Sequence, residues 1–158
     1  MKKHIAFVLL VSLFIVTLSA CTNPHGPPVN FIGQTWEESG NSVTVSSAEI
    51  VDIFETEDGH SIVPQQDQRL LLIHCRVRLA HGWQLYSGTY ADYRLKYYDL
   101  HETVVQNDSQ GEQEYILIFA LDAETCADGN VELASVHFII EGKNGAARIE
   151  RDFDMRTI

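Results

Sequence analysis

Alternation of apolar and polar side chains runs through most of this chain, and it constrains the fold more than any other feature. The clearest case is residues 68–79, where the odd positions from Leu71 to Leu79 are apolar while His74, Arg76 and Arg78 are polar. Successive side chains of a β-strand point to opposite faces, so this period of two predicts a strand with one buried face. The uninterrupted apolar run at 115–121 predicts a central strand.

Further strands are expected on both sides of these two. Residues 42–54 are rich in Val and Ile, and their phase slips at Ser46–Ser47, which indicates a β-bulge. Residues 93–99 read as one strand, and residues 131–140 and 148–155 as a hairpin turned at Lys143-Asn144-Gly145. Because no convincing helical stripe follows residue 30, we predict an all-β domain over residues 42–158. It would be an antiparallel immunoglobulin-like β-sandwich of seven to eight strands.

The first 20 residues have the layout of a secretory signal peptide. Lys2 and Lys3 precede an apolar stretch that ends in small residues, and the stretch is shorter than the roughly 20 residues of a spanning helix. The following Leu18-Ser19-Ala20-Cys21 resembles the lipobox of bacterial lipoproteins. This resemblance implies that residues 1–20 are removed and that Cys21 carries the lipid. Two or three acyl chains would hold the protein stably on a cell membrane or outer membrane, facing the extracytoplasmic side.

Residues 21–41 are expected to be a tether that leads into the domain, because prolines and glycines are concentrated there and proline-rich segments are stiff and extended. The whole chain has a net charge of −11, which becomes −13 once Lys2 and Lys3 are removed. An acidic surface of this size argues against binding nucleic acid through a basic patch.

Two cysteines, Cys75 and Cys126, remain after Cys21. An even pair in an exported protein suggests a disulfide, although two buried free thiols are the alternative. The alternation of the strand at 68–79 places Cys75 on the inward face.

No familiar catalytic or metal-binding motif is present in the sequence. It has no Gly-x-Ser-x-Gly elbow, no His-Glu-x-x-His and no phosphate-binding glycine loop. Carboxylates at 55–59 would suit calcium, but they lack the ligand spacing of a calcium loop, so a solvated turn is favoured. We therefore expect a protein that is not an enzyme and that needs neither a metal nor another cofactor.

Aromatic side chains gather in residues 81–93, between two predicted strands. The candidate binding residues are Trp83, Tyr86, Tyr90 and Tyr93. Aromatic loops on a rigid sandwich are a usual place for recognising a protein or a glycan. The alternative is that these rings close the open end of the core.

Residues 42–155 are similar to the telokin-like immunoglobulin-like domains of bacterial surface lipoproteins. The similarity lies in the Ile/Val-rich first strand, the long second strand, Tyr-Arg-Leu-Lys-Tyr-Tyr-Asp at 93–99 and Tyr-Ile-Leu-Ile-Phe at 115–119. It supports the architecture, since fold alone does not define function. Two functions remain open: a surface-tethered binding module, or an inhibitor or sensor accessory of an envelope enzyme or transporter.

Overall fold

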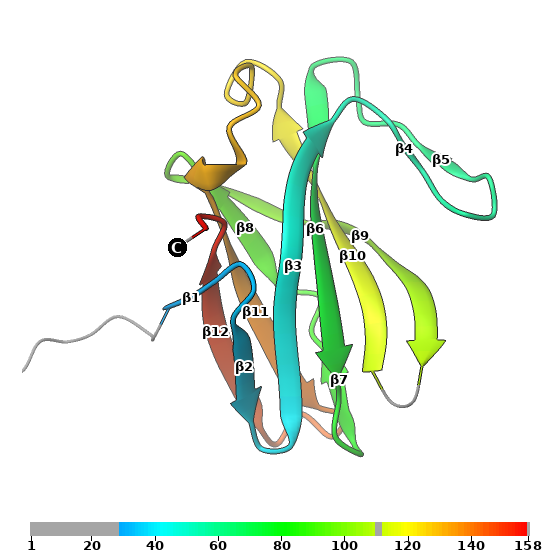
Figure 1. The fold of residues 1–158 in the computed structure, drawn as a ribbon, viewed down its shortest axis with the longest axis vertical. Coiled ribbons are helices and arrows are strands. Elements are labelled where there is room, and N and C mark those ends of the chain that lie inside the picture. The colour runs from blue at the N-terminus through cyan, green and yellow to red at the C-terminus, as the bar shows by residue number, and fades with distance from the viewer. Residues whose placement is uncertain (1–28, 110–111, 158) are drawn as a thin grey trace, which may run out of the picture.

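The computed structural model describes residues 29–109 and 112–157, and it is built almost entirely of β-strands in two facing layers (Figure 1). The signal peptide, Cys21 and residues 22–28 of the tether lie outside the described residues, so the predictions made for them stay predictions. All-β architecture is confirmed. The strand number is not, because twelve strands occur in the described residues where seven to eight were expected.

One layer, here called the β6 layer, contains β2 (Thr35–Glu38), β3 (Asn41–Val51), β6 (Gln68–Arg78) and β10 (Glu112–Asp122) in that order. The other, the β11 layer, contains β1 (Val29–Phe31), β12 (Arg148–Asp154), β11 (Ala134–Gly142) and β8 (Tyr90–Tyr93). The short β7 (Trp83–Leu85) pairs with the far end of β11, and a 3₁₀ turn, η1 (Val131–Leu133), precedes β11. The main core lies between the two layers.

The long strand β9 (Lys96–Ser109) belongs to both layers. Its first residues, Lys96–Asp99, pair with β8, whereas the rest pairs with β10. The register with β10 shifts between the pairs Ile118–Glu102 and Phe119–Leu100, so His101 is the extra residue. A bulge of this kind bends a strand and raises its twist, which lets β9 leave one layer and enter the other.

A hairpin arm formed by β4 (Phe54–Glu55) and β5 (Ser61–Ile62) stands apart from the two layers, beside β9 (Figure 1). It contributes Ile62 and Phe54 to a second apolar cluster on the outer face of the β6 layer. That face carries Leu70 and Leu72 from β6 and Ile118 from β10, all buried. The apolar run at 115–121 is therefore explained by burial on both faces of β10.

Several local predictions are confirmed. The pairing of β3 with β6 shifts register between Val45 and Ser47, as the phase slip indicated. Lys143–Gly145 lies in the turn of the β11–β12 hairpin, with Gly145 at a φ of 70°. Cys75 faces the core, as the alternation of its strand required.

The single strand predicted for 93–99 is wrong. Tyr93 ends β8, Lys96 starts β9, and the two strands form a hairpin through Arg94 and Leu95. Both turn residues have positive φ, 52° and 66°, as in the turns that match the twist of a hairpin. The turn leaves Leu95 92% exposed, whereas Tyr93 is fully buried.

The domain also starts earlier than residue 42. Within the segment 21–41, Val29–Phe31 forms β1, which pairs in parallel with β12, and Thr35–Glu38 forms β2, which pairs with β3. Trp36 is only 3% exposed and belongs to the main core. The described part of this segment is therefore structural, and the β1–β12 pair departs from the purely antiparallel arrangement expected.

Candidate functional site

The four candidate aromatic residues do not form one surface. Tyr93 is fully buried in the main core, and its hydroxyl donates a hydrogen bond to the Asn130 carbonyl at 3.0 Å. Tyr90 lies on the outer face of the β11 layer, where its ring stacks on His137. Trp83 and Tyr86 line a groove at one end of the sandwich. The core alternative thus holds for Tyr93 and in part for Trp83, which is partly buried and packs against the main core.

This groove, here called the β7 groove, has a volume of about 450 Å³. The groove lies beside the part of β9 that crosses to the β6 layer, since Leu100 and Thr103 of β9 line it. Among the described residues, β7 pairs with β11 alone. Its walls are largely apolar and carry a few amide groups and one ammonium. The lining residues are Leu79, Trp83, Gln84, Leu85, Tyr86, Ser87, Leu100, Thr103, Gln113, Tyr115 and Lys143.

Tyr86 is held in place at the rim of the groove. The ring packs so closely on Gly88 that a Cβ at that position would lie 2.4 Å from Tyr86 Cε1. The guanidinium of Arg148 lies 5.2 Å from the centre of the same ring. Beside it, Gln84 donates a hydrogen bond to Glu141 at 2.9 Å. A fixed aromatic ring loses little entropy when it binds a ligand, and an apolar hollow with a few polar groups is the usual form of a binding site.

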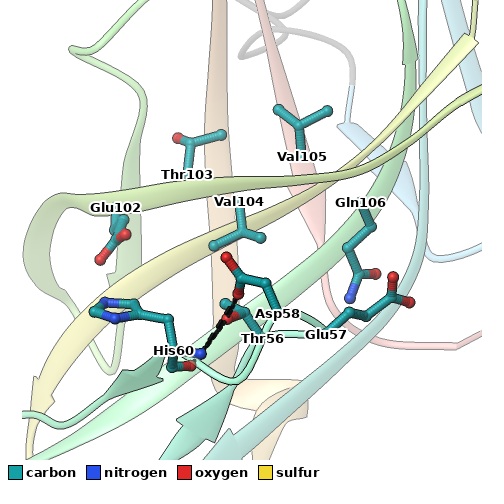
Figure 2. A pocket seen from close by; sticks show the side chains of 9 residues that line it. All are labelled: Thr56, Glu57, Asp58, His60, Glu102, Thr103, Val104, Val105 and Gln106. Carbon is teal, nitrogen blue, oxygen red and sulfur yellow. Dashed lines mark hydrogen bonds between the residues drawn. The ribbon is translucent and has the colours of Figure 1, made fainter.

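A second hollow of about 420 Å³ lies between the arm and β9 (Figure 2). Glu102, Val104 and Gln106 of β9 point toward the arm, while Thr103 and Val105 point away from it (Figure 2). On the arm side, Asp58 accepts hydrogen bonds from the Thr56 hydroxyl and the His60 backbone N–H. These two hydrogen bonds lower the pKa of Asp58, and the bond from Thr56 has the larger effect.

The carboxylate of Asp58 thus closes its own turn, as expected of a solvated turn at 55–59. Across residues 29–109 and 112–157, no group of three or more His, Cys, Asp or Glu side chains is arranged to hold a metal ion. Neither is any helix in those ranges long and apolar enough to cross a membrane.

Cys75 and Cys126 are not bridged, and both are buried free thiols. The reason is their register. Gln68 pairs with Asp122, close to Cys126, whereas Cys75 lies seven residues farther along β6, about 23 Å at the usual rise of a strand. A disulfide requires Cα atoms within about 7 Å. Burial raises the pKa of both thiols, which leaves them unreactive.

His137 occupies a position that the sequence did not reveal. Its Nδ1 lies 2.6 Å from Asp152 Oδ1, and its Nε2 lies 3.1 Å from Glu150 Oε2. His137 alternates with the core residues Val136 and Phe138 and so faces outward. That two carboxylates of the next strand flank its ring depends on the register of β11 with β12, which a single sequence does not display.

Comparison with known proteins supports the fold and no more. No protein-family model and no curated protein sequence matches the chain. Among solved structures, it is similar to an uncharacterized β-sandwich protein from Clostridium difficile 630, with a TM-score of 0.55 and 12% sequence identity. The similarity covers 85% of this chain and 99% of the other. The chain therefore has a β-sandwich fold, while its function is a matter for proposal.

Proposed function

We propose that this protein is a non-catalytic binding module, which lipid on Cys21 holds on the extracytoplasmic side of a membrane and which engages a protein or glycan partner through the β7 groove. The observation that supports it is the groove itself. Trp83, Leu85 and Tyr86 offer apolar surface at the open end of a rigid sandwich, and Gln84 and Gln113 add amide groups that can donate and accept hydrogen bonds.

Site-specific photo-crosslinking in intact cells tests this proposal. A photoreactive amino acid replaces Ser87, an exposed residue of the groove, and in a matched control it replaces the exposed Glu55 of the arm. We expect a discrete adduct from position 87 alone, and we expect Trp83→Ser to remove it. Equal adducts from both positions, or an adduct that persists in the Trp83→Ser variant, would contradict binding at the groove.

The membrane anchor is tested separately by Cys21→Ala. The variant should keep its fold and either leave the membrane fraction or remain unprocessed, since no acyl chain can be attached to alanine. If it is processed and stays membrane-bound like the natural chain, the lipid assignment is wrong, whatever the crosslinking shows.

A second function, inhibitor of an envelope enzyme, is favoured by one feature. The β8–β9 turn presents Leu95 almost fully exposed on a tight two-residue hairpin, a shape that can enter an active site. If a crosslinked partner is an enzyme, adding the purified protein should lower its activity, and Leu95→Asp should abolish that effect. A partner whose activity is unaffected leaves the binding module as the proposal.

A further inference from the structure

The outer face of the β11 layer carries a row of rings across three strands. The register places Tyr97 of β9 opposite Asp92, and Tyr90 of β8 opposite both Asp99 and His137. The centres of the Tyr90 and Tyr97 rings lie 5.4 Å apart with an edge-to-face angle of 78°. Those of Tyr90 and His137 lie 4.9 Å apart and are stacked. The three side chains therefore form one continuous surface, here called the tyrosine face.

Tyr97 is the accessible end of this row, since it is 70% exposed. Tyr90 contacts one side of the Tyr97 ring, and most of the rest of that ring meets solvent. Its open ring continues the surface of Tyr90 and His137, so a partner can reach it.

Carboxylates surround the tyrosine face. Asp92 and Asp99 flank Tyr97, and in the described part of the chain neither forms an ion pair. Asp92 does accept a hydrogen bond from the Leu95 backbone N–H at 3.0 Å. At the other end, Asp152 and Glu150 contact His137, and Glu150 is also paired with Arg148. Asp92 and Asp99 therefore place two negative charges beside the exposed ring, with no ion-pair partner among the residues that the structure describes.

We infer that the tyrosine face binds a cationic side chain, the lysine or arginine of a protein partner, with the Tyr97 ring under the cation and Asp92 and Asp99 beside it. A cation over an aromatic ring is attracted by the negative face of the π-system, and neighbouring carboxylates add to that attraction. The net charge of −11 steers a basic partner toward the surface and repels an acidic one. This site shares no residue with the lining of the β7 groove, so it can be tested separately from the proposed function.

The test uses the full chain in detergent micelles and a ten-residue peptide that alternates lysine with glycine. Binding is followed by calorimetry and by the NMR signals of the tyrosine rings at low salt. We expect Tyr97→Phe to bind like the natural chain, because it keeps the ring, and Tyr97→Leu to bind about two- to fivefold more weakly. Asp99→Asn should also weaken binding, while the same loss of charge in Glu55→Gln, on the arm, should have a smaller effect.

Two results would overturn the inference. One is that Tyr97→Leu and Asp99→Asn reduce the affinity for the lysine peptide no more than Glu55→Gln does. Binding of the peptide would then depend on net charge alone. The other is that the matching glutamate–glycine peptide, or a neutral oligosaccharide, perturbs the Tyr97 ring signals as strongly as the lysine peptide does.

Discussion

The two outer faces of the sandwich are built on the same alternation and yet differ in kind. On the β6 layer, Leu70, Leu72 and Ile118 face outward, and the β4–β5 arm covers them. On the β11 layer, the outward positions include Tyr90, Tyr97, His137 and several carboxylates, with Tyr97 left open. One face is thus a second core, and the other is a surface on which a partner can bind. The arm beside β9 accounts for the difference (Figure 1).

The largest test of this comparison uses two adjacent leucines of β6. Leu71 faces the main core and Leu72 faces the arm, and each is almost completely buried. We expect Leu71→Ala and Leu72→Ala each to lower the free energy of unfolding by about 2–5 kcal/mol, because both leave a cavity. Denaturant titration measures this. If Leu72→Ala alone lowered the free energy of unfolding by less than about 1 kcal/mol, the arm would have to move to fill the space. The outer face would then not be a close-packed core.

Thr89 tests the β11 layer at the place where β7 and β8 meet. Its buried hydroxyl oxygen accepts a hydrogen bond from the Ile139 N–H at 3.2 Å. Thr89→Val removes that acceptor and leaves the Ile139 amide without a hydrogen-bond partner. We therefore expect the free energy of unfolding to fall by about 1–3 kcal/mol. Thr35→Val, at an exposed position, is the control and should change stability little. Equal effects of the two would mean that the amide finds another partner.

A substitution in the β8–β9 turn, beside the tyrosine face, should stabilise the protein. Leu95 has a φ of 66°, and the left-handed region is costly for a side chain with a Cβ. The β2–β3 turn uses Ser39 and Gly40, also at positive φ, and has glycine at the equivalent second place. Leu95→Gly should therefore raise the free energy of unfolding by about 1 kcal/mol in a denaturant titration. A loss of stability would imply that the exposed leucine makes contacts within the protein.

The smallest expected effect on stability concerns the hydrogen bonds between the start of β9 and the end of β10. Asp122 accepts hydrogen bonds from Lys96 and, at 2.9 Å, from the Tyr98 hydroxyl, and these lower its pKa below the ordinary 3.8. A lowered pKa adds stability above about pH 4, and that stability is lost as the pH falls through the folded-state pKa. Asp122→Asn should thus be less stable than the natural chain at pH 5, with the gap narrowing by pH 3.

Unfolding curves at the two pH values measure this gap. The same substitution at the exposed Asp67 serves as the control. A gap between the natural chain and Asp122→Asn that stays constant from pH 5 to pH 3 would contradict the role of the carboxylate.

How far sequence reasoning reached depended on whether local signals agreed with the fold. The strand at 68–79, the bulge at Ser46–Ser47 and the Lys143–Gly145 turn were predictable because patterning and turn residues coincide there. The Arg94–Leu95 turn was not, because neither residue is a glycine or asparagine, the usual marks of such a turn. Without that turn, the alternation of a single strand over 93–99 places Tyr97 on the same face as the buried Tyr93.

The candidate site was harder to predict than the fold. Trp83 and Tyr86 were recognised from composition, but their groove partners are distant in the sequence: Leu100 and Tyr115 come from β9 and β10, and Leu79 directly follows β6. The tyrosine face likewise depends on the register of β8 with β9 and β11. Contacts of this type follow from long-range pairing, which a single sequence does not display.

The passage of β9 through both layers has a consequence for folding. Its 14 residues are hydrogen-bonded to β8 at one end and to β10 at the other, so neither layer can separate without breaking this strand's pairing. We expect the sandwich to unfold as a single cooperative unit. In native-state hydrogen exchange, amides of β11 and of β6 should then open with the same free energy. The arm, which is joined by short pairings only, would open earlier.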